Sequence, residues 1–108
     1  MSTVITCTSL EQVRSHIDRL DRQLLSLIAE RGAYVKQAAG FKRTVAEVPA
    51  PQRVEQVIAG VKQLAPEVGA DPAVVEATWR AMIAAFIDAE TAAHAALQAQ
   101  TPSLTQSS

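Results

Sequence analysis

The sequence predicts an all-α domain of three helices, and three observations support this prediction. Hydrophobic residues make up 48% of the 108 residues and aromatic residues only 4%, and alanine and leucine, which lead the helix propensity scale, supply many of the hydrophobic positions. Apolar residues recur at steps of three and four along three segments. Prolines occur in the short stretches between these segments, where a helix has to end or begin.

The first helix is expected from Ser9 to about Lys42. Two overlapping capping boxes open it, Thr8 with Glu11 and Ser9 with Gln12. No proline interrupts the segment, and its apolar face keeps a strict three-four alternation to the end. This face comprises Leu10, Val13, Ile17, Leu20, Leu24, Leu27, Arg31, Tyr34, Ala38 and Phe41.

Such a helix is too long for one compact domain of this size. At 1.5 Å per residue it extends roughly 50 Å, whereas a compact chain of this length has a radius of gyration of about 13 Å. The far end of the helix would therefore need another chain to cover it. We expect a homodimer.

The second helix is expected to begin with Pro51 in its first turn and to stop at Pro66. N–H groups of the first turn have no acceptor within the helix, so a proline there removes no hydrogen bond. Its apolar face comprises Val54, Val57, Ile58, Val61 and Leu64. The third helix should begin with Asp71 as its N-cap and Pro72 at the first helical position. Its buried side is expected to carry Val75, Trp79, Met82, Ile83, Phe86, Ile87, Ala93 and Leu97, with Glu90 on the same side.

These helices form one domain over residues 9–99, with a short lead over residues 1–8 and a tail over residues 100–108 that we expect to be disordered. The first residues lack the basic segment and apolar run of a signal peptide, and no stretch approaches the ~18 apolar residues of a membrane span. The formal charge of -1 provides no field that would attract nucleic acid or an anionic membrane. We expect a cytoplasmic protein.

Two ionisable residues, Arg31 and Glu90, interrupt the apolar faces of their helices. A buried charge without a partner costs several kcal/mol, so each of them needs one. In one interpretation the two side chains pair with each other or extend to the surface. In the other interpretation they bind a ligand.

The spacing of the other cations favours a ligand. Lys42 lies eleven residues beyond Arg31, which returns to within about 20° of the same helix face, about 16 Å along the axis. Arg53 lies in the first turn of the second helix, where free N–H groups favour a carboxylate, although taken alone it would be assigned to the solvated surface. Arg14 lies about 25 Å from Arg31 and can reach that pocket only in an antiparallel partner chain. These cations predict a pocket for a small dianion.

Other reactive groups are scarce. His16 and His94 have no Cys, Asp or His partner at ligand spacing, and Cys7 is the single cysteine. We therefore expect no metal site, no cofactor and no disulfide within the chain. The sequence shows no nucleophile with a base at helical reach and no glycine-rich phosphate loop. Cations with one carboxyl group suit a reaction that has no covalent step.

The chain contains the stretches CTSLEQVRSHIDRLDRQLLSLIAER, YVKQAAGFK, VPAPQRV and FIDAE, which extend from Cys7 to Glu90. Together they resemble the all-helical chorismate mutases, and most of all the branch that contains the isochorismate–pyruvate lyases. The resemblance implies the chorismate mutase type II fold, an intertwined helical homodimer with two equivalent active sites. Each site would take one arginine from the partner's long helix.

The resemblance also implies a role for each charged residue. Arg14 matches the arginine that the partner contributes, Arg31 one that holds a substrate carboxylate, and Arg53 one that helps to bind the ring carboxylate. Lys42 matches a lysine that contacts both the ether oxygen and a carboxylate. Glu90 falls where many bacterial members have glutamine and some fungal mutases have glutamate, and with Lys42 it would address the ether oxygen.

The implied activity is the rearrangement of chorismate to prephenate. The alternative is the related lyase reaction, which releases pyruvate from isochorismate to give salicylate, and lyases of this branch commonly retain mutase activity. The VPAPQRV loop resembles the lyase branch, whereas Glu90 favours a mutase. Val54 and Phe86 replace a carboxylate and a small hydroxyl residue of mutases fused to dehydratases, which leaves contacts to the ring hydroxyl open.

We therefore expect a chorismate mutase, with an isochorismate–pyruvate lyase as the alternative. The sequence leaves both pathways open, aromatic amino acid biosynthesis and salicylate biosynthesis. A third alternative is a helical dimerisation module without enzymatic activity, in which Arg31 and Glu90 form a structural pair.

Overall fold

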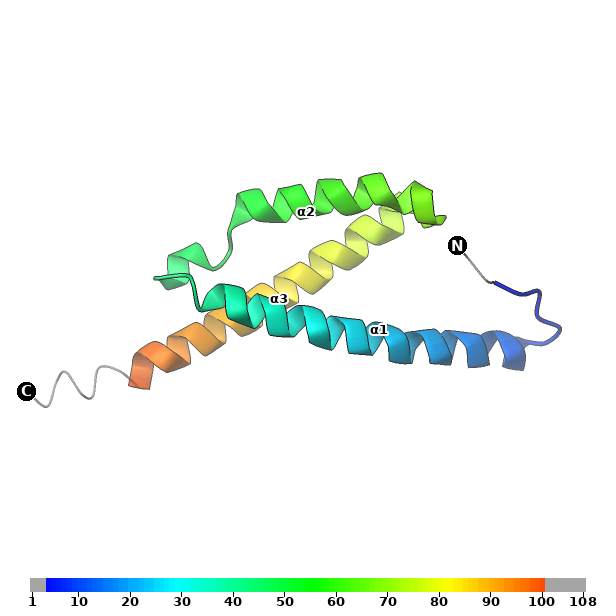
Figure 1. Cartoon of the computed structure of the whole chain (residues 1–108), viewed down its shortest axis with the longest axis horizontal. Helices are drawn as coiled ribbons and strands as arrows, with labels where there is room; N and C mark the ends of the chain where they lie inside the picture. The colour runs from blue at the N-terminus through cyan, green and yellow to red at the C-terminus, as the bar shows by residue number, and fades with distance from the viewer. Residues whose placement is uncertain (1–3, 101–108) are drawn as a thin grey trace, which may run out of the picture.

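The computed structural model describes residues 4–100, and these residues fold into helices and loops without a strand (Figure 1). The elements in order are α1 (Leu10–Ala39), the short 3-10 helix η1 (Val45–Glu47), α2 (Pro51–Leu64), the 3-10 helix η2 (Ala65–Val68) and α3 (Pro72–Gln100). The predicted all-α class with three main helices is confirmed. The expected disordered tail falls, apart from its first residue, outside the described residues.

The start of α1 follows the capping signals in the sequence. Ser9 is the N-cap, and its side-chain oxygen accepts a hydrogen bond from the Gln12 backbone N–H at 3.1 Å. The Gln12 side chain reaches back and accepts a hydrogen bond from the Thr8 backbone N–H at 2.9 Å. Side chains thus pair one N–H group of the first turn and one N–H group just before the N-cap.

The end of α1 differs from the prediction, because the helix stops at Ala39 rather than near Lys42. From Gly40 to Lys42, each backbone N–H bonds the carbonyl oxygen three residues earlier, at 3.1 Å, so the last turn is tightened. The chain then leaves the helical register. Phe41, predicted on the apolar face, is consequently 89% exposed.

The three helices do not form a compact bundle. α3 crosses the C-terminal half of α1 and packs against α2, while the N-terminal half of α1 extends away from both (Figure 1). The protomer measures 71 × 28 × 18 Å and has a radius of gyration of 19.0 Å, well above the about 13 Å of a compact chain of this length. No residue of α1 is buried within the protomer.

The hydrophobic core of the described protomer is small and lies where α2, α3 and the loop before α2 meet. It consists of Val48, Ile58, Ala65 and Ile83. Ile58 and Ile83 were expected from helical periodicity, whereas Val48 lies in a loop, where no periodicity marks it. Ala93 and Leu97 were predicted on the buried side of α3 but are exposed, because the last turns of α3 extend beyond the other helices (Figure 1).

A surface network of ion pairs joins α2 to α3. Arg80 donates hydrogen bonds from both terminal nitrogens to the two carboxylate oxygens of Glu55, at 3.0 and 3.2 Å. The Arg80 Nε donates to Glu76 at 2.9 Å, and Lys62 Nζ lies 3.0 Å from the other Glu76 oxygen. This network links the two helices at the surface. Among the described residues, no helix has the length and apolar character needed to cross a membrane.

Candidate active site

A cavity of about 350 Å³ lies between the C-terminal half of α1, the loop before α2, the first turns of α2 and the middle of α3. Four of the five predicted site residues line it: Arg31, Lys42, Arg53 and Glu90. The remainder of the wall is mostly apolar. Such a mixture of a hydrophobic lining with a few converging charged groups is typical of a small-molecule site.

Lys42 connects the loop to α3 at this cavity. Its Nζ donates hydrogen bonds to Glu90 Oε2 at 3.0 Å and to the backbone carbonyl of Val48 at 3.1 Å. The helical spacing predicted for Lys42 and Arg31 does not apply, since Lys42 lies beyond the end of α1. The side chain nevertheless reaches the cavity that Arg31 lines, because the chain continues in tight turns from Ala39.

Glu90 provides the carboxylate of the cavity and is only 8% exposed. Its partner is Lys42, on the loop, and not Arg31. The Arg31–Glu90 pair expected for a purely structural module is therefore not the arrangement in this protomer. A buried carboxylate in hydrogen-bonded contact with an ammonium group satisfies the requirement that a buried charge be paired.

Arg31 projects from α1 into the same cavity and is half-buried. Its guanidinium carbon lies 5.6 Å from the centre of the Phe86 ring of α3, within range of a cation–π interaction. Among residues 4–100, the Arg31 side chain interacts with the Phe86 ring and has no carboxylate partner. The N–H donors of Arg31 are therefore available to an anion.

Arg53 occupies the third position of α2 and is exposed at the edge of the cavity. The N-cap of α2 is Ala50, in the left-handed region with φ 40° and ψ 63°, and it supplies no side-chain acceptor to the first turn. The backbone N–H groups at the start of α2 thus have no side-chain cap from Ala50. A helix N-terminus beside an arginine is a suitable binding place for a carboxylate.

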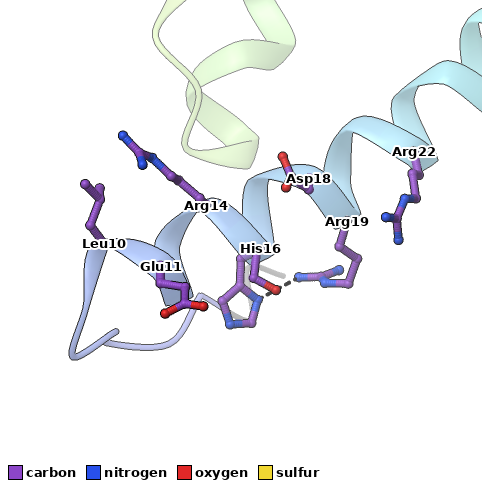
Figure 2. Close-up of a pocket in the computed structure, with 8 residues that line it drawn as sticks. Leu10, Glu11, Arg14, His16, Asp18, Arg19 and Arg22 are labelled. Carbon is purple, nitrogen blue, oxygen red and sulfur yellow. Dashed lines mark hydrogen bonds between the residues drawn. The ribbon is translucent and has the colours of Figure 1, made fainter.

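Arg14 does not join the other four residues. It lies near the start of α1, exposed, beside a surface hollow of about 640 Å³ (Figure 2). The hollow is also lined by Leu10, Glu11, Ser15, His16, Asp18, Arg19 and Arg22. Seventeen residues of helix separate Arg14 from Arg31, about 25 Å along the axis, so both cannot serve one small cavity of the same protomer.

Sequence reasoning missed two features of the cavity. It placed Phe86 in the core without indicating that its ring faces Arg31, and it gave no role to the Val48 carbonyl that holds Lys42. Both are contacts between segments far apart in the chain, which periodicity does not report. Across residues 4–100, no group of three or more His, Cys, Asp or Glu side chains could hold a metal ion.

Comparison with known proteins identifies the family. The family model of chorismate mutase type II matches residues 13–91, a range that includes all five predicted site residues. This chain is a member of the chorismate mutase type II family. The prediction of the family from sequence is confirmed, and the chain falls among chorismate-utilising enzymes.

The chain is also similar to a curated protein of known name. It is 36% identical over 87 residues to the isochorismate pyruvate lyase of Pseudomonas aeruginosa. The aligned region covers 81% of this chain and 86% of the relative. The similarity thus extends through the helices that build the cavity.

Proposed function

We propose that the protein is a chorismate mutase, which rearranges chorismate to prephenate. The observation that supports this most directly is the convergence of Arg31, Lys42, Arg53 and Glu90 on one cavity of about 350 Å³. Chorismate carries two carboxylates and an ether oxygen on which negative charge develops as the C–O bond breaks. The arginines can bind the two carboxylates, and Lys42 and Glu90 can contact the ether oxygen.

The proposed mechanism requires no covalent intermediate. Arg31 holds the side-chain carboxylate, while Arg53 and the N-terminus of α2 hold the ring carboxylate. With both ends fixed, the substrate is kept in the conformer in which the reacting carbons approach each other. The C–O bond then breaks as the C–C bond forms, in one pericyclic step.

Lys42 acts on the ether oxygen in this proposal. Its ammonium group is held in the free protein by Glu90 and by the Val48 carbonyl, so little reorganisation is needed when charge develops on the substrate. A protonated Glu90 can donate a second hydrogen bond to the same oxygen. Charge-assisted hydrogen bonds contribute about 1.5–3 kcal/mol each, so a few of them with conformer selection approach the roughly 8 kcal/mol of a modest enzymatic acceleration.

We further propose that the active form is a homodimer in which Arg14 completes the partner's site. The dimer is supported by the apolar side chains of α1 that are exposed in the single chain, among them Val13, Ile17, Leu20 and Leu24. A stripe of large apolar side chains on a helix without a buried residue requires a cover. An antiparallel partner helix would cover it and bring Arg14 to the opposite cavity.

The second candidate is an isochorismate–pyruvate lyase, and the relative of that name in Pseudomonas aeruginosa favours it. Its substrate has the same two carboxylates and the same ether linkage, with the hydroxyl group elsewhere on the ring. Elimination of pyruvate would proceed by a pericyclic hydrogen transfer as the C–O bond breaks. The same cations would therefore serve either reaction.

The two candidates are distinguished by incubating the purified protein with each compound. Prephenate formed from chorismate supports the mutase, and salicylate with pyruvate formed from isochorismate supports the lyase. If neither compound is consumed, and neither raises the melting temperature, the protein is instead a dimerisation module.

The role of the cavity is tested with Lys42→Ala and the control Arg43→Ala. Arg43 is the next residue in sequence and does not line the cavity. Loss of one charge-assisted contact predicts a fall in kcat/KM of about 10- to 100-fold for Lys42→Ala and no comparable fall for Arg43→Ala. Equal activity of the two variants would contradict the proposed site.

A further inference from the structure

Phe86 of α3 lies between two cavities. One is the candidate active site, and the other, of about 320 Å³, is lined by Gly32, Val35, Lys36, Phe86, Ala89, Glu90 and Ala93. Val35, Phe86 and Glu90 line both cavities. The Phe86 ring is therefore part of the wall that separates them.

Gly32 of α1 provides the space for this ring. A Cβ at position 32 would lie 2.9 Å from Phe86 Cε1, closer than such atoms approach each other, and 3.3 Å from Cζ, closer than most such contacts. The ring can lie against the backbone of α1 only because residue 32 has no side chain. Glycine within a helix is unfavourable relative to alanine, so this close approach is obtained at a cost in helix stability.

The ring contacts two consecutive residues of α1 in different ways. It fills the space at Gly32, and it lies 5.6 Å from the guanidinium carbon of Arg31. The face of an aromatic ring attracts a cation through its quadrupole without accepting a conventional hydrogen bond. A carboxylate partner would instead occupy the N–H donors that a substrate carboxylate needs.

We propose that Phe86 is a positioning residue for Arg31: seated against Gly32, its ring holds the guanidinium at the cavity and leaves the N–H donors free for a substrate carboxylate. The proposal deepens the proposed function and rests on it, because it assigns Arg31 a carboxylate of the substrate. It also explains why a bulky ring, rather than a small polar residue, stands at this position of the wall.

The first test compares KM with kcat. Arg31 binds a carboxylate that is present in the ground state and in the transition state, so weakening it raises KM more than it lowers kcat. We expect Phe86→Leu to raise KM roughly 3- to 30-fold, the range of a cation–π contact, and Phe86→Tyr, which retains a ring face, to restore most of this loss. A fall in kcat alone, or equal defects in both variants, would overturn the proposal.

The second test is a double-mutant cycle with Gly32→Ala. The added Cβ displaces the ring, so Gly32→Ala should raise KM as Phe86→Leu does, and the double variant should be no worse than either single variant. Ile87→Ala, which alters the same cavity wall without a described contact to Arg31, serves as the control and should add to Gly32→Ala. Additive effects of Gly32→Ala and Phe86→Leu would mean that the ring acts only as a wall, which overturns the proposal.

A third measurement separates this proposal from the assignment of activity. If neither chorismate nor isochorismate is turned over, the proposed function fails, and the contact is then tested by unfolding the ligand-free protein. Arg31→Gln and Phe86→Leu should show coupling in the equilibrium constant for unfolding at a fixed protein concentration. Independent effects of these two substitutions would show that the ring does not hold the guanidinium.

Discussion

At the scale of a single residue, the side chain at position 90 determines which hydrogen bonds the cavity can make. Its carboxylate is only 8% exposed and accepts a hydrogen bond from Lys42 at 3.0 Å. A glutamine in its place would keep an oxygen for Lys42 and would add N–H donors. A leucine would keep the volume and lose both functions.

We therefore predict opposite results for Glu90→Gln and Glu90→Leu. The glutamine variant should remain active, because its amide keeps an oxygen for Lys42 and adds an N–H donor for the ether oxygen. The leucine variant leaves Lys42 without its partner and should lose about 10- to 100-fold in kcat/KM. Values of kcat/KM for the two variants check both statements, and a glutamine variant as impaired as the leucine variant would contradict the role assigned to this polar group.

The site shows what can be predicted for residues from sequence. The apolar stripe marked Arg31 and Glu90 as misplaced charges, and both line the cavity. The partners of these charges could not be predicted, because Lys42 reaches Glu90 across 48 residues of sequence and Arg31 meets a ring on another helix. Periodicity places a residue on a helix face, but the packing of one helix on another decides which side chain it meets.

At the scale of an element, the start of α2 contains a strained residue. Ala50, the N-cap, has φ 40° and ψ 63°, a left-handed conformation that costs a residue with a Cβ about 1–2 kcal/mol. Glycine removes this strain, but its greater freedom in the unfolded chain costs roughly 0.5–1 kcal/mol. The strain is the larger of the two terms.

Ala50→Gly should accordingly stabilise the protein by up to about 1 kcal/mol. The matched control is Ala59→Gly, at an exposed position inside α2, which should destabilise it by about 0.5–1 kcal/mol. Urea unfolding of both variants at one protein concentration measures the difference. Equal destabilisation by the two substitutions would show that the left-handed geometry of Ala50 carries no strain.

The contact between α2 and α3 depends on pH through its ion pairs. Hydrogen bonds from Arg80 hold the pKa of Glu55 below its ordinary value of 4.5, and hydrogen bonds from Lys62 and Arg80 do the same for Glu76. A carboxylate whose pKa is lower in the folded state stabilises the fold above the pKa of the unfolded state. That stabilisation is lost as the pH falls through the folded-state pKa.

We predict that Arg80→Met lowers the melting temperature slightly at neutral pH and reduces its decline below pH 4.5, the ordinary value for these carboxyl groups. The effect should be small and should weaken in high salt, because the network lies at the surface. Arg43→Met is the control, since Arg43 is exposed and takes no part in the described network. Melting curves across the acidic range test this, and parallel pH profiles for the native protein and Arg80→Met would contradict it.

The helices also show where prediction from sequence ends. Ser9, Pro51 and Pro72 fixed three helix starts, because capping and proline act on local backbone groups. The end of α1 was placed three residues too late, since the apolar series continues through Phe41 whereas the backbone tightens after Ala39. The burial of Val48 in a loop depends on how α3 packs, which no local signal reports.

At the scale of the whole molecule, the shape of the protomer argues for a partner. The structure is 71 Å long, and the core that its described residues form has four buried hydrophobic residues, which leaves most apolar side chains of α1 in contact with water. Leu24, near the middle of α1, is 54% exposed. The excessive length of the first helix was predictable from sequence, but the protomer alone does not supply its cover.

If the two chains of a dimer share their active sites, two different variants should complement each other. A monomer could not show this effect. Suppose that one chain carries Arg14→Ala and the other carries Lys42→Ala, and that each variant alone keeps only a small part of the native activity. In the mixed dimer, the chain with Arg14→Ala has its own Lys42 and receives Arg14 from its partner. One of the two sites of the dimer is therefore complete. The second site of that dimer lacks both groups.

Mixing the two impaired variants by joint unfolding and refolding should therefore raise the activity above that of either variant alone. Random pairing makes half of the dimers mixed, so about a quarter of all sites are complete and about a quarter of the native activity returns. Mixing Arg31→Ala with Lys42→Ala is the control, because both residues line the same cavity of one protomer and no mixed site can be complete. Activity restored in the control, or absent from the Arg14→Ala and Lys42→Ala mixture, would mean that Arg14 does not act across the interface.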